Sequence, residues 1–249
     1  MCTLVIARRP GDPWPLLVAA NRDEMVDRPW QPPGRHWPDR TEVVAGRDEL
    51  AGGTWLGVNG SGVVAAILNR VGSLGPSADK RSRGELVLEA LDHADARDAA
   101  VAMAQLDGRA WRSFNLVVAD NRDAYWLRGT GGAQVTAKAI PAGVHMITSR
   151  ELDDPESPRI RNYLERFRSA HVPDVEAGDW SAWQALLASR VYAVADGPTE
   201  TMCVVTDRGY GTVSSSLIAL PAIERLGEKP RWLFAPGRPD EAEFAPVSL

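Results

Sequence analysis

The segment from residue 2 to residue 24, CTLVIARRPGDPWPLLVAANRDE, decides the fold of this chain. Two apolar runs, Cys2 to Ala7 and Pro15 to Ala20, flank a turn rich in proline and glycine, which predicts a β-hairpin. If the hairpin is symmetric about that turn, paired residue numbers add to about 23, so Cys2 lies opposite Asn21 with Asp23 just beyond the strand end. The hairpin therefore predicts that a thiol and a carboxylate share one small volume.

Cys2 would carry both a thiol and a primary amine once the initiator Met1 is removed. An α-amino group titrates near pKa 7.7–8.0, so it accepts the thiol proton at working pH and returns it to a leaving amine. This is an established arrangement for acyl transfer. We expect Asp23 to orient the ammonium form and Asn69 to donate a hydrogen bond to the oxyanion. With Asn21 opposite the thiol, the predicted catalytic set is Cys2, Asp23, Asn69 and Asn21.

A structural interpretation of the same residues stays open. A free cysteine is often a small buried hydrophobe. The chain also repeats the Asn-Arg-Asp sequence at Asn121 to Asp123, where it is typical of a plain hairpin turn.

Composition limits the classes of function. The chain has 249 residues, 44% of them hydrophobic, which favours one soluble domain over residues 1–249. Its net charge of −5 argues against nucleic acid as a partner. No apolar run approaches the ~20 residues of a membrane span, and the amino terminus is not a signal peptide. Cys2 and Cys203 give neither a disulfide framework nor a zinc motif. We therefore expect a cytoplasmic protein without a metal site and without membrane insertion.

The rest of the chain predicts strands in clusters separated by helices, an α+β arrangement. We expect a long irregular loop from Arg28 to Asp39, and a two-residue hairpin at Asn59-Gly60 between strands Thr54 to Val58 and Gly62 to Leu68. Apolar spacing predicts a helix over Gly84 to Leu106, a second around Ile160 to Phe167 and a third around Trp180 to Leu187. Further strands are expected at Phe114–Ala119, Ala124–Leu127, Val144–Thr148, Met202–Thr206, Thr212–Leu220 and Trp232–Phe234.

Several short motifs, in this order, resemble one known family. They are Met1-Cys2-Thr3, Asn21-Arg22-Asp23-Glu24, Gly52-Gly53-Thr54-Trp55-Leu56-Gly57, Ser82-Arg83-Gly84, Phe114-Asn115-Leu116 and Tyr210-Gly211-Thr212. Together they resemble the NRDE family, also called the transport and Golgi organisation protein two family. The resemblance implies a four-layer αββα sandwich of the amino-terminal nucleophile (Ntn) hydrolase type.

The resemblance extends to the bile salt hydrolase and penicillin V acylase branch, whose chains also begin Met-Cys-Thr. That branch carries an Arg-Asn-x-Asp motif where this chain reads Ala20-Asn21-Arg22-Asp23, and an oxyanion asparagine where Asn69 stands. Val213 occupies a position where NRDE members more often have arginine.

Two functions follow as expectations. The first is a hydrolase of small non-peptide amides that needs no cofactor. The second is a non-catalytic carrier for haem or an acyl-CoA-like or lipid ligand in the same cleft, as NRDE members are linked to haem trafficking and lipid homeostasis. In either case Arg22, Glu24, Trp55, Arg70 and His36 are expected to contact the small-molecule ligand. Oligomeric state is left open.

Overall fold

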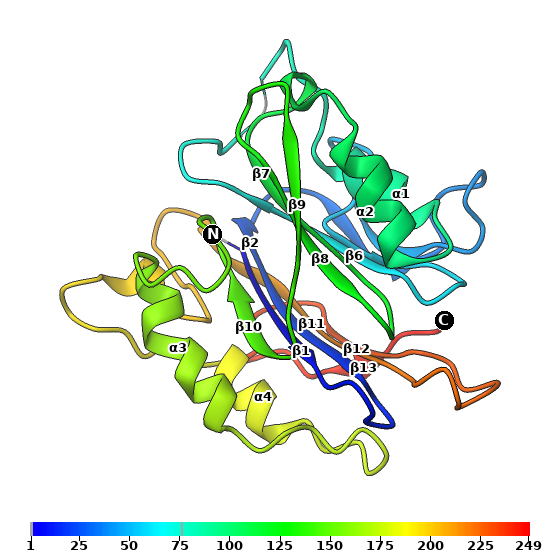
Figure 1. Ribbon diagram of the computed structural model, residues 1–249. Helices are drawn as coiled ribbons and strands as arrows, with labels where there is room; N and C mark the ends of the chain where they lie inside the picture. The colour runs from blue at the N-terminus through cyan, green and yellow to red at the C-terminus, as the bar shows by residue number, and fades with distance from the viewer. Residues whose placement is uncertain (1, 76) are drawn as a thin grey trace. The chain divides into compact units, whose positions relative to one another are not determined.

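The structure is a computed structural model that describes residues 2–75 and 77–249. The chain forms two compact units, one running from the amino terminus to Arg28 and from Ala142 to Val247, the other from Pro29 to Pro141 with the last two residues. Each unit contains one antiparallel sheet and a pair of α-helices (Figure 1). A single domain over residues 1–249 stays a prediction.

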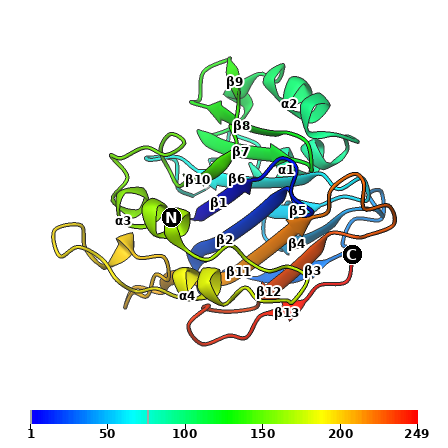
Figure 2. The same ribbon diagram turned by 60° about the horizontal axis from the view of Figure 1, so that its bottom comes forward.

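The first unit is a six-stranded sheet in the order β10-β1-β2-β11-β12-β13. Figure 2 shows its strands side by side, with helix α4 lying across them. The strands are β1 (Thr3–Arg8), β2 (Leu16–Met25), β10 (Gly143–Ile147), β11 (Tyr210–Leu220), β12 (Arg231–Ala235) and β13 (Ala245–Pro246). Helices α3 (Pro158–Ser169) and α4 (Ser181–Leu187) pack against it, and a 3-10 turn, η2, covers Pro198–Glu200.

Alternation along the two hairpin strands decides which side chains meet these helices. Val5 and Ala7 of β1, with Leu17 and Ala19 of β2, pack into one buried cluster with aromatic residues of α3 and α4. In that cluster Phe167 meets Trp183 edge-to-face, with ring centroids 5.6 Å apart. Thr3, Asn21 and Asp23 have the same parity, so they belong to the helix-covered face of the sheet.

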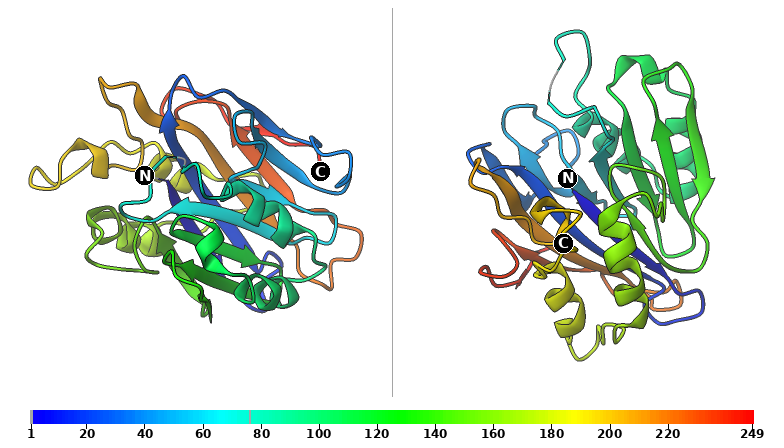
Figure 3. Two further views of the ribbon diagram at one scale, coloured as in Figure 1. Left: turned by 90° about the horizontal axis from the view of Figure 1, so that it is seen from above. Right: turned by 90° about the vertical axis from the view of Figure 1, so that its left-hand side faces the viewer.

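The second unit is a seven-stranded sheet in the order β3-β4-β5-β6-β7-β8-β9. Helices α1 (Gly84–Leu91) and α2 (Ala96–Ala104) cover one of its faces (Figure 3). Its strands are β3 (Trp30–Gly34), β4 (Val44–Asp48), β5 (Leu56–Val58), β6 (Val64–Asn69), β7 (Phe114–Ala119), β8 (Ala124–Gly129) and β9 (Val135–Ala139), with a 3-10 turn, η1, at Gly108–Ala110. Asn121 to Asp123 form the plain turn between β7 and β8, as predicted: Asp120 N–H donates to Asp123 O at 2.8 Å.

Two predicted elements of this unit are wrong. The single helix expected over Gly84 to Leu106 is broken between α1 and α2, because Asp95 adopts extended backbone and caps the second helix by accepting from Asp98 N–H at 2.8 Å. The two-residue turn at Asn59-Gly60 is a longer loop that ends at Val63. In it Gly62, with φ at +83°, adopts the left-handed conformation.

Two further expectations need correction. The segment Arg28 to Asp39 is not irregular throughout, because Trp30–Gly34 forms strand β3 and pairs with β4. The strand expected at Met202 to Thr206 reduces to one isolated bridge between Val205 and Gly211. Backbone groups of that segment bind side chains of the sheet instead, as described below.

Candidate active site around Cys2 and Asp23

The register of the β1–β2 hairpin differs by one residue from the symmetric prediction. Arg8 pairs with Leu16 and Thr3 pairs with Asn21, because the connection takes every residue from Arg9 to Pro15. The expected pairing of Cys2 with Asn21 is therefore wrong. Asp23 is also not beyond the strand end, because β2 continues to Met25 along its other neighbour, β11. Extending the observed register by one residue sets Cys2 opposite Arg22, next to Asp23.

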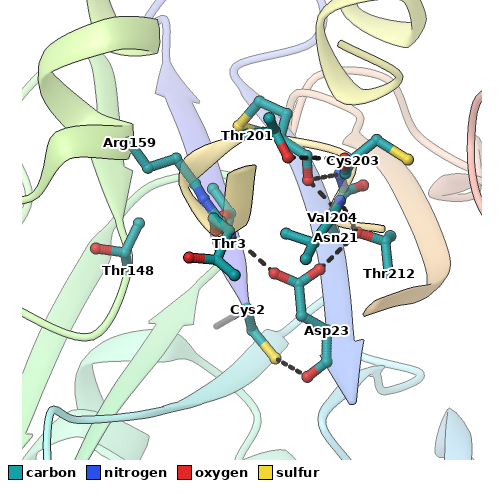
Figure 4. Close-up of polar contacts among 12 residues, drawn as sticks. Cys2, Thr3, Asn21, Asp23, Thr148, Arg159, Thr201, Cys203, Val204 and Thr212 are labelled. Atoms are coloured by element: carbon teal, nitrogen blue, oxygen red, sulfur yellow. Dashed lines mark hydrogen bonds and ion pairs between the residues drawn. The ribbon is translucent and has the colours of Figure 1, made fainter. Parts of the chain in front are cut away.

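Cys2 and Asp23 nevertheless meet. The half-buried Cys2 thiol donates to the backbone carbonyl oxygen of Asp23, with an Sγ–O distance of 3.6 Å (Figure 4). Burial and the negative charge of Asp23 raise the pKa of the Cys2 thiol above its ordinary value. The thiol is thus protonated at neutral pH, and attack on a carbonyl carbon requires a base.

On the helix-covered face, Arg159 and Thr212 bond the carboxylate of Asp23. Arg159, from the first turn of α3, donates through Nη1 to Asp23 Oδ2 at 2.9 Å and to Thr3 Oγ1 at 2.7 Å. The hydroxyl of Thr212 donates to Asp23 Oδ1 at 2.7 Å. Figure 4 shows these side chains directed toward one another, while the Cys2 sulfur extends the other way.

This ion pair is withdrawn from solvent. The side chains of Arg159 and Asp23 are 1% and 0% exposed, and Arg159 Nη2 also donates to Thr199 O at 2.6 Å. Such a pair loses much of its Coulombic gain to desolvation, so its geometry is held by the accompanying hydrogen bonds. The network fixes the position of the Asp23 carboxylate.

A β-bulge in β11 aims Thr212 at this carboxylate. Thr212 pairs with Asp23 and Ser215 pairs with Asn21, so the register shifts by one residue at Val213. Without that extra residue, two side chains three positions apart would point to opposite faces of the sheet. The bulge brings both hydroxyls to the helix-covered face.

Asn21 is fully engaged in this layer. Its side-chain amide donates to Leu187 O at 3.0 Å and to Met202 O at 2.9 Å, and its oxygen accepts from Ser215 Oγ at 2.6 Å. The residue thereby ties the end of α4 and the segment at Met202 to the sheet. The catalytic role expected for Asn21 stays a prediction.

The remaining candidates are distributed over both units. Arg22 and Glu24 flank Asp23 on β2, and Glu24 Oε2 lies 3.8 Å from Arg28 Nε. In the second unit, Asn69 ends β6 opposite Phe114, and Arg70 donates to Asn115 Oδ1 at 2.7 Å. Also there, Trp55 stacks edge-on against Trp30 with centroids 5.8 Å apart, and His36 Nε2 contacts Pro32 O at 2.8 Å. Ligand contacts for these residues, and the oxyanion role of Asn69, stay predictions.

Sequence reasoning missed Arg159 because the arginine-rich helix resembles a solvated surface. A signal was present, however: Arg159 lies four residues before Tyr163 and eight before Phe167, which places it on the buried stripe of α3. Thr3 and Thr212 were within recognised motifs but had no role assigned.

The described residues contain neither a candidate metal site nor a candidate membrane span. No group of three or more His, Cys, Asp or Glu side chains is arranged to hold a metal ion. None of the helices in residues 2–75 and 77–249 is long and apolar enough to cross a membrane.

Comparison with solved structures supports the architecture. The chain is similar to the Caenorhabditis elegans orthologue of N-acylethanolamine-hydrolyzing acid amidase, with a TM-score of 0.51 at 12% identity over 87% of this chain and 92% of that one. It is also similar to a mutant of conjugated bile acid hydrolase from Clostridium perfringens, with a TM-score of 0.54 at 12% identity over 100% and 97%. At such identities the likeness concerns the fold alone, and it confirms the predicted α+β class of the Ntn hydrolase type.

Sequence comparison identifies closer relatives. The human Transport and Golgi organization protein 2 homolog is 36% identical over 110 residues, which is 42% of this chain and 38% of that protein. The mouse homolog is 33% identical over 108 residues, with the same shares covered. The matching segment thus spans well under half of these relatives. The sequence model of the Transport and Golgi organisation 2 family matches residues 1–225, which is nearly the whole chain. The protein therefore belongs to that family.

Proposed function

We propose that this protein hydrolyses a small non-peptide amide, with Cys2 as the nucleophile after removal of Met1. One observation carries the proposal: a half-buried thiol contacts the main chain of an aspartate whose carboxylate is held by a buried arginine and by the hydroxyl of Thr212. Met1 lies outside the described residues, so its removal belongs to the proposal.

The hairpin register supports a role for Asp23 in orienting the Cys2 amine. Because Cys2 lies opposite Arg22 when the register is extended, its α-nitrogen lies on the side toward Asp23. Arg159 Nη1 donates to Asp23 Oδ2 at 2.9 Å and Thr212 Oγ1 donates to Oδ1 at 2.7 Å, so both carboxylate oxygens are held in fixed directions. An ammonium group at Cys2 would meet acceptors whose direction Arg159 and Thr212 already fix.

The reaction follows from these groups. The amine takes the thiol proton, and the thiolate sulfur attacks the amide carbonyl carbon, whose π electrons move to the oxygen. The tetrahedral intermediate collapses, the C–N bond breaks, and the leaving amine takes the proton from the ammonium. Water then attacks the thioester, the C–S bond breaks, and the carboxylic acid and the thiol are released. Asn69 is the proposed oxyanion donor.

The test compares two preparations of the full chain. In one, a protease removes an amino-terminal tag so that Cys2 is the first residue; in the other, Met1 is retained. p-Nitrophenyl acetate is the acyl probe, and intact mass reports addition of 42 Da, about one acetyl group, on Cys2. A panel of N-acyl amides then defines turnover, with Cys2→Ala as the control.

We expect acylation and turnover only in the preparation that begins at Cys2. Equal acylation with Met1 retained would remove the amine from the mechanism. The alternative function, a carrier for haem or an acyl-CoA-like ligand, gives a different result: haem or acyl-CoA binds to both the native chain and Cys2→Ala, with no acyl-enzyme and no turnover.

A further inference from the structure

The Tyr210-Gly211-Thr212 motif has no role in the mechanism beyond its threonine. The hydroxyl of Tyr210 donates to the backbone oxygen of Asp23 at 3.4 Å, and the Cys2 thiol donates to that same oxygen at 3.6 Å. The phenol and the thiol therefore cannot be farther apart than the sum of these two distances. Tyr210 is a polar neighbour of the proposed nucleophile.

The remainder of the motif holds Tyr210 in this place. A Cβ atom at Gly211 would lie 2.7 Å from Val204 O, so only glycine permits the observed approach of the two segments. Thr212 N–H donates to Val204 O at 2.9 Å, and Thr206 Oγ1 donates to Tyr210 O at 2.5 Å. Each residue of the motif thus serves the same small region around Asp23.

We propose that Tyr210 is a catalytic residue whose hydroxyl donates a hydrogen bond to the substrate carbonyl oxygen as Cys2 attacks it. This inference rests on the proposed function. The bonds of both donors to Asp23 O are long, and catalytic hydrogen bonds commonly shorten only when substrate is bound. When the thiol attacks, the Tyr210 hydroxyl moves its hydrogen bond from the Asp23 carbonyl oxygen to the substrate carbonyl oxygen, which gains negative charge. The phenol keeps its proton throughout.

The electrostatic setting suits a donor and not a base. Burial, with the negative charge of Asp23, raises the pKa of Tyr210 well above its ordinary value. The phenol is therefore neutral over the whole pH range of turnover. A donor aimed at a developing oxyanion typically contributes 10²–10³-fold to the rate, roughly.

The experiment compares Tyr210→Phe with Tyr192→Phe in chains that begin at Cys2. Tyr192 is 40% exposed and serves as the matched control. Two reactions of Cys2 are measured in each: alkylation by iodoacetamide, which forms no oxyanion, and acylation by p-nitrophenyl acetate, which does. We expect Tyr210→Phe to slow acylation about 100-fold while alkylation changes by less than about threefold. Tyr192→Phe should leave both rates unchanged.

Three outcomes would overturn this role. Acylation of Tyr210→Phe at the native rate shows that the hydroxyl gives nothing to the transition state. An equal loss in both reactions shows that Tyr210 only positions the thiol. Failure of the native chain to acylate at all sinks the proposed function itself, and the Tyr210 role with it.

Discussion

Replacing Arg159 with methionine should strongly destabilise the first unit. Methionine retains much of the apolar stem of arginine but has no charge and no donors. The substitution leaves the Asp23 carboxylate, 0% exposed, with Thr212 as the donor at Oδ1 and without its cation at Oδ2. Thr3 and Thr199 lose the donors that Arg159 provides.

The expected loss is about 3–5 kcal/mol in the free energy of unfolding, because breaking a buried ion pair from one side leaves an uncompensated charge. For a chain of about 150–250 residues, each kcal/mol lowers the midpoint of thermal unfolding by about 2–4 °C. Arg159→Met should therefore lower that midpoint by roughly 6–20 °C.

Arg161→Met is the matched control, on the same helix two residues later. Its ion pair with Asp196 has a similar N–O distance of 2.8 Å, but the arginine side chain is 49% exposed. Exposed pairs contribute about 0–1 kcal/mol, so this variant should unfold close to the native chain.

Urea unfolding of the native chain, Arg159→Met, Asp23→Asn and the double variant completes the test. Because the two residues are in contact, the double variant should lose less than the sum of the single losses, by at least ~1 kcal/mol. A loss for Arg159→Met no larger than that of Arg161→Met, or strictly additive losses, would refute the assignment of a buried, coupled pair.

Three other predictions concern the same unit. Cys203 should resist iodoacetamide at pH 8 in the folded protein and react only after denaturation, because burial and a bond to Asp240 raise its pKa to about 12; native labelling of Cys203, read by peptide mass, would contradict this. Gly211→Ala should cost about 1–3 kcal/mol in urea unfolding, because the new Cβ meets Val204 O, whereas Gly132→Ala, with open space around it, should be nearly neutral. Asn21→Asp should cost about 3 kcal/mol at pH 7, because a carboxylate would face Leu187 O and Met202 O; the cost should shrink toward pH 5, where a protonated carboxyl donates again, and a pH-independent cost would count against this cause.

The sequence predicted those elements whose apolar periodicity is strong. Strands β1, β7 and β11 and helices α3 and α4 lie close to the expected ranges, whereas β2 runs on to Met25, past its expected end at Ala20. The register of the hairpin was one residue off, because the turn sequence does not reveal how many of its residues leave the ladder. Strand β3 was missed because two prolines hide its pattern, and pairing with β4 is a tertiary event.

The sequence motifs of the candidate site could be predicted, but the side chains that bond Asp23 could not. Cys2 and Asp23 were linked by sequence spacing alone, since a hairpin joins them. Arg159 lies 136 positions from Asp23, and only the packing of α3 on the sheet brings it there. The aim of Thr212 depends on a bulge at Val213, which forms only when β11 pairs with β2.

Strand β2 separates the two groups of side chains in the candidate site. The Asp23 carboxylate and Arg159 lie on the helix-covered side of β2, and the Cys2 sulfur extends to the other side. The main chain of Asp23 connects the two sides, because its carbonyl oxygen accepts from the thiol. Substitutions on the side of the sheet that the Cys2 sulfur faces therefore leave the buried ion pair of Asp23 and Arg159 in place. The side of β2 that carries the thiol can therefore vary in sequence without a change in the charges on the opposite side.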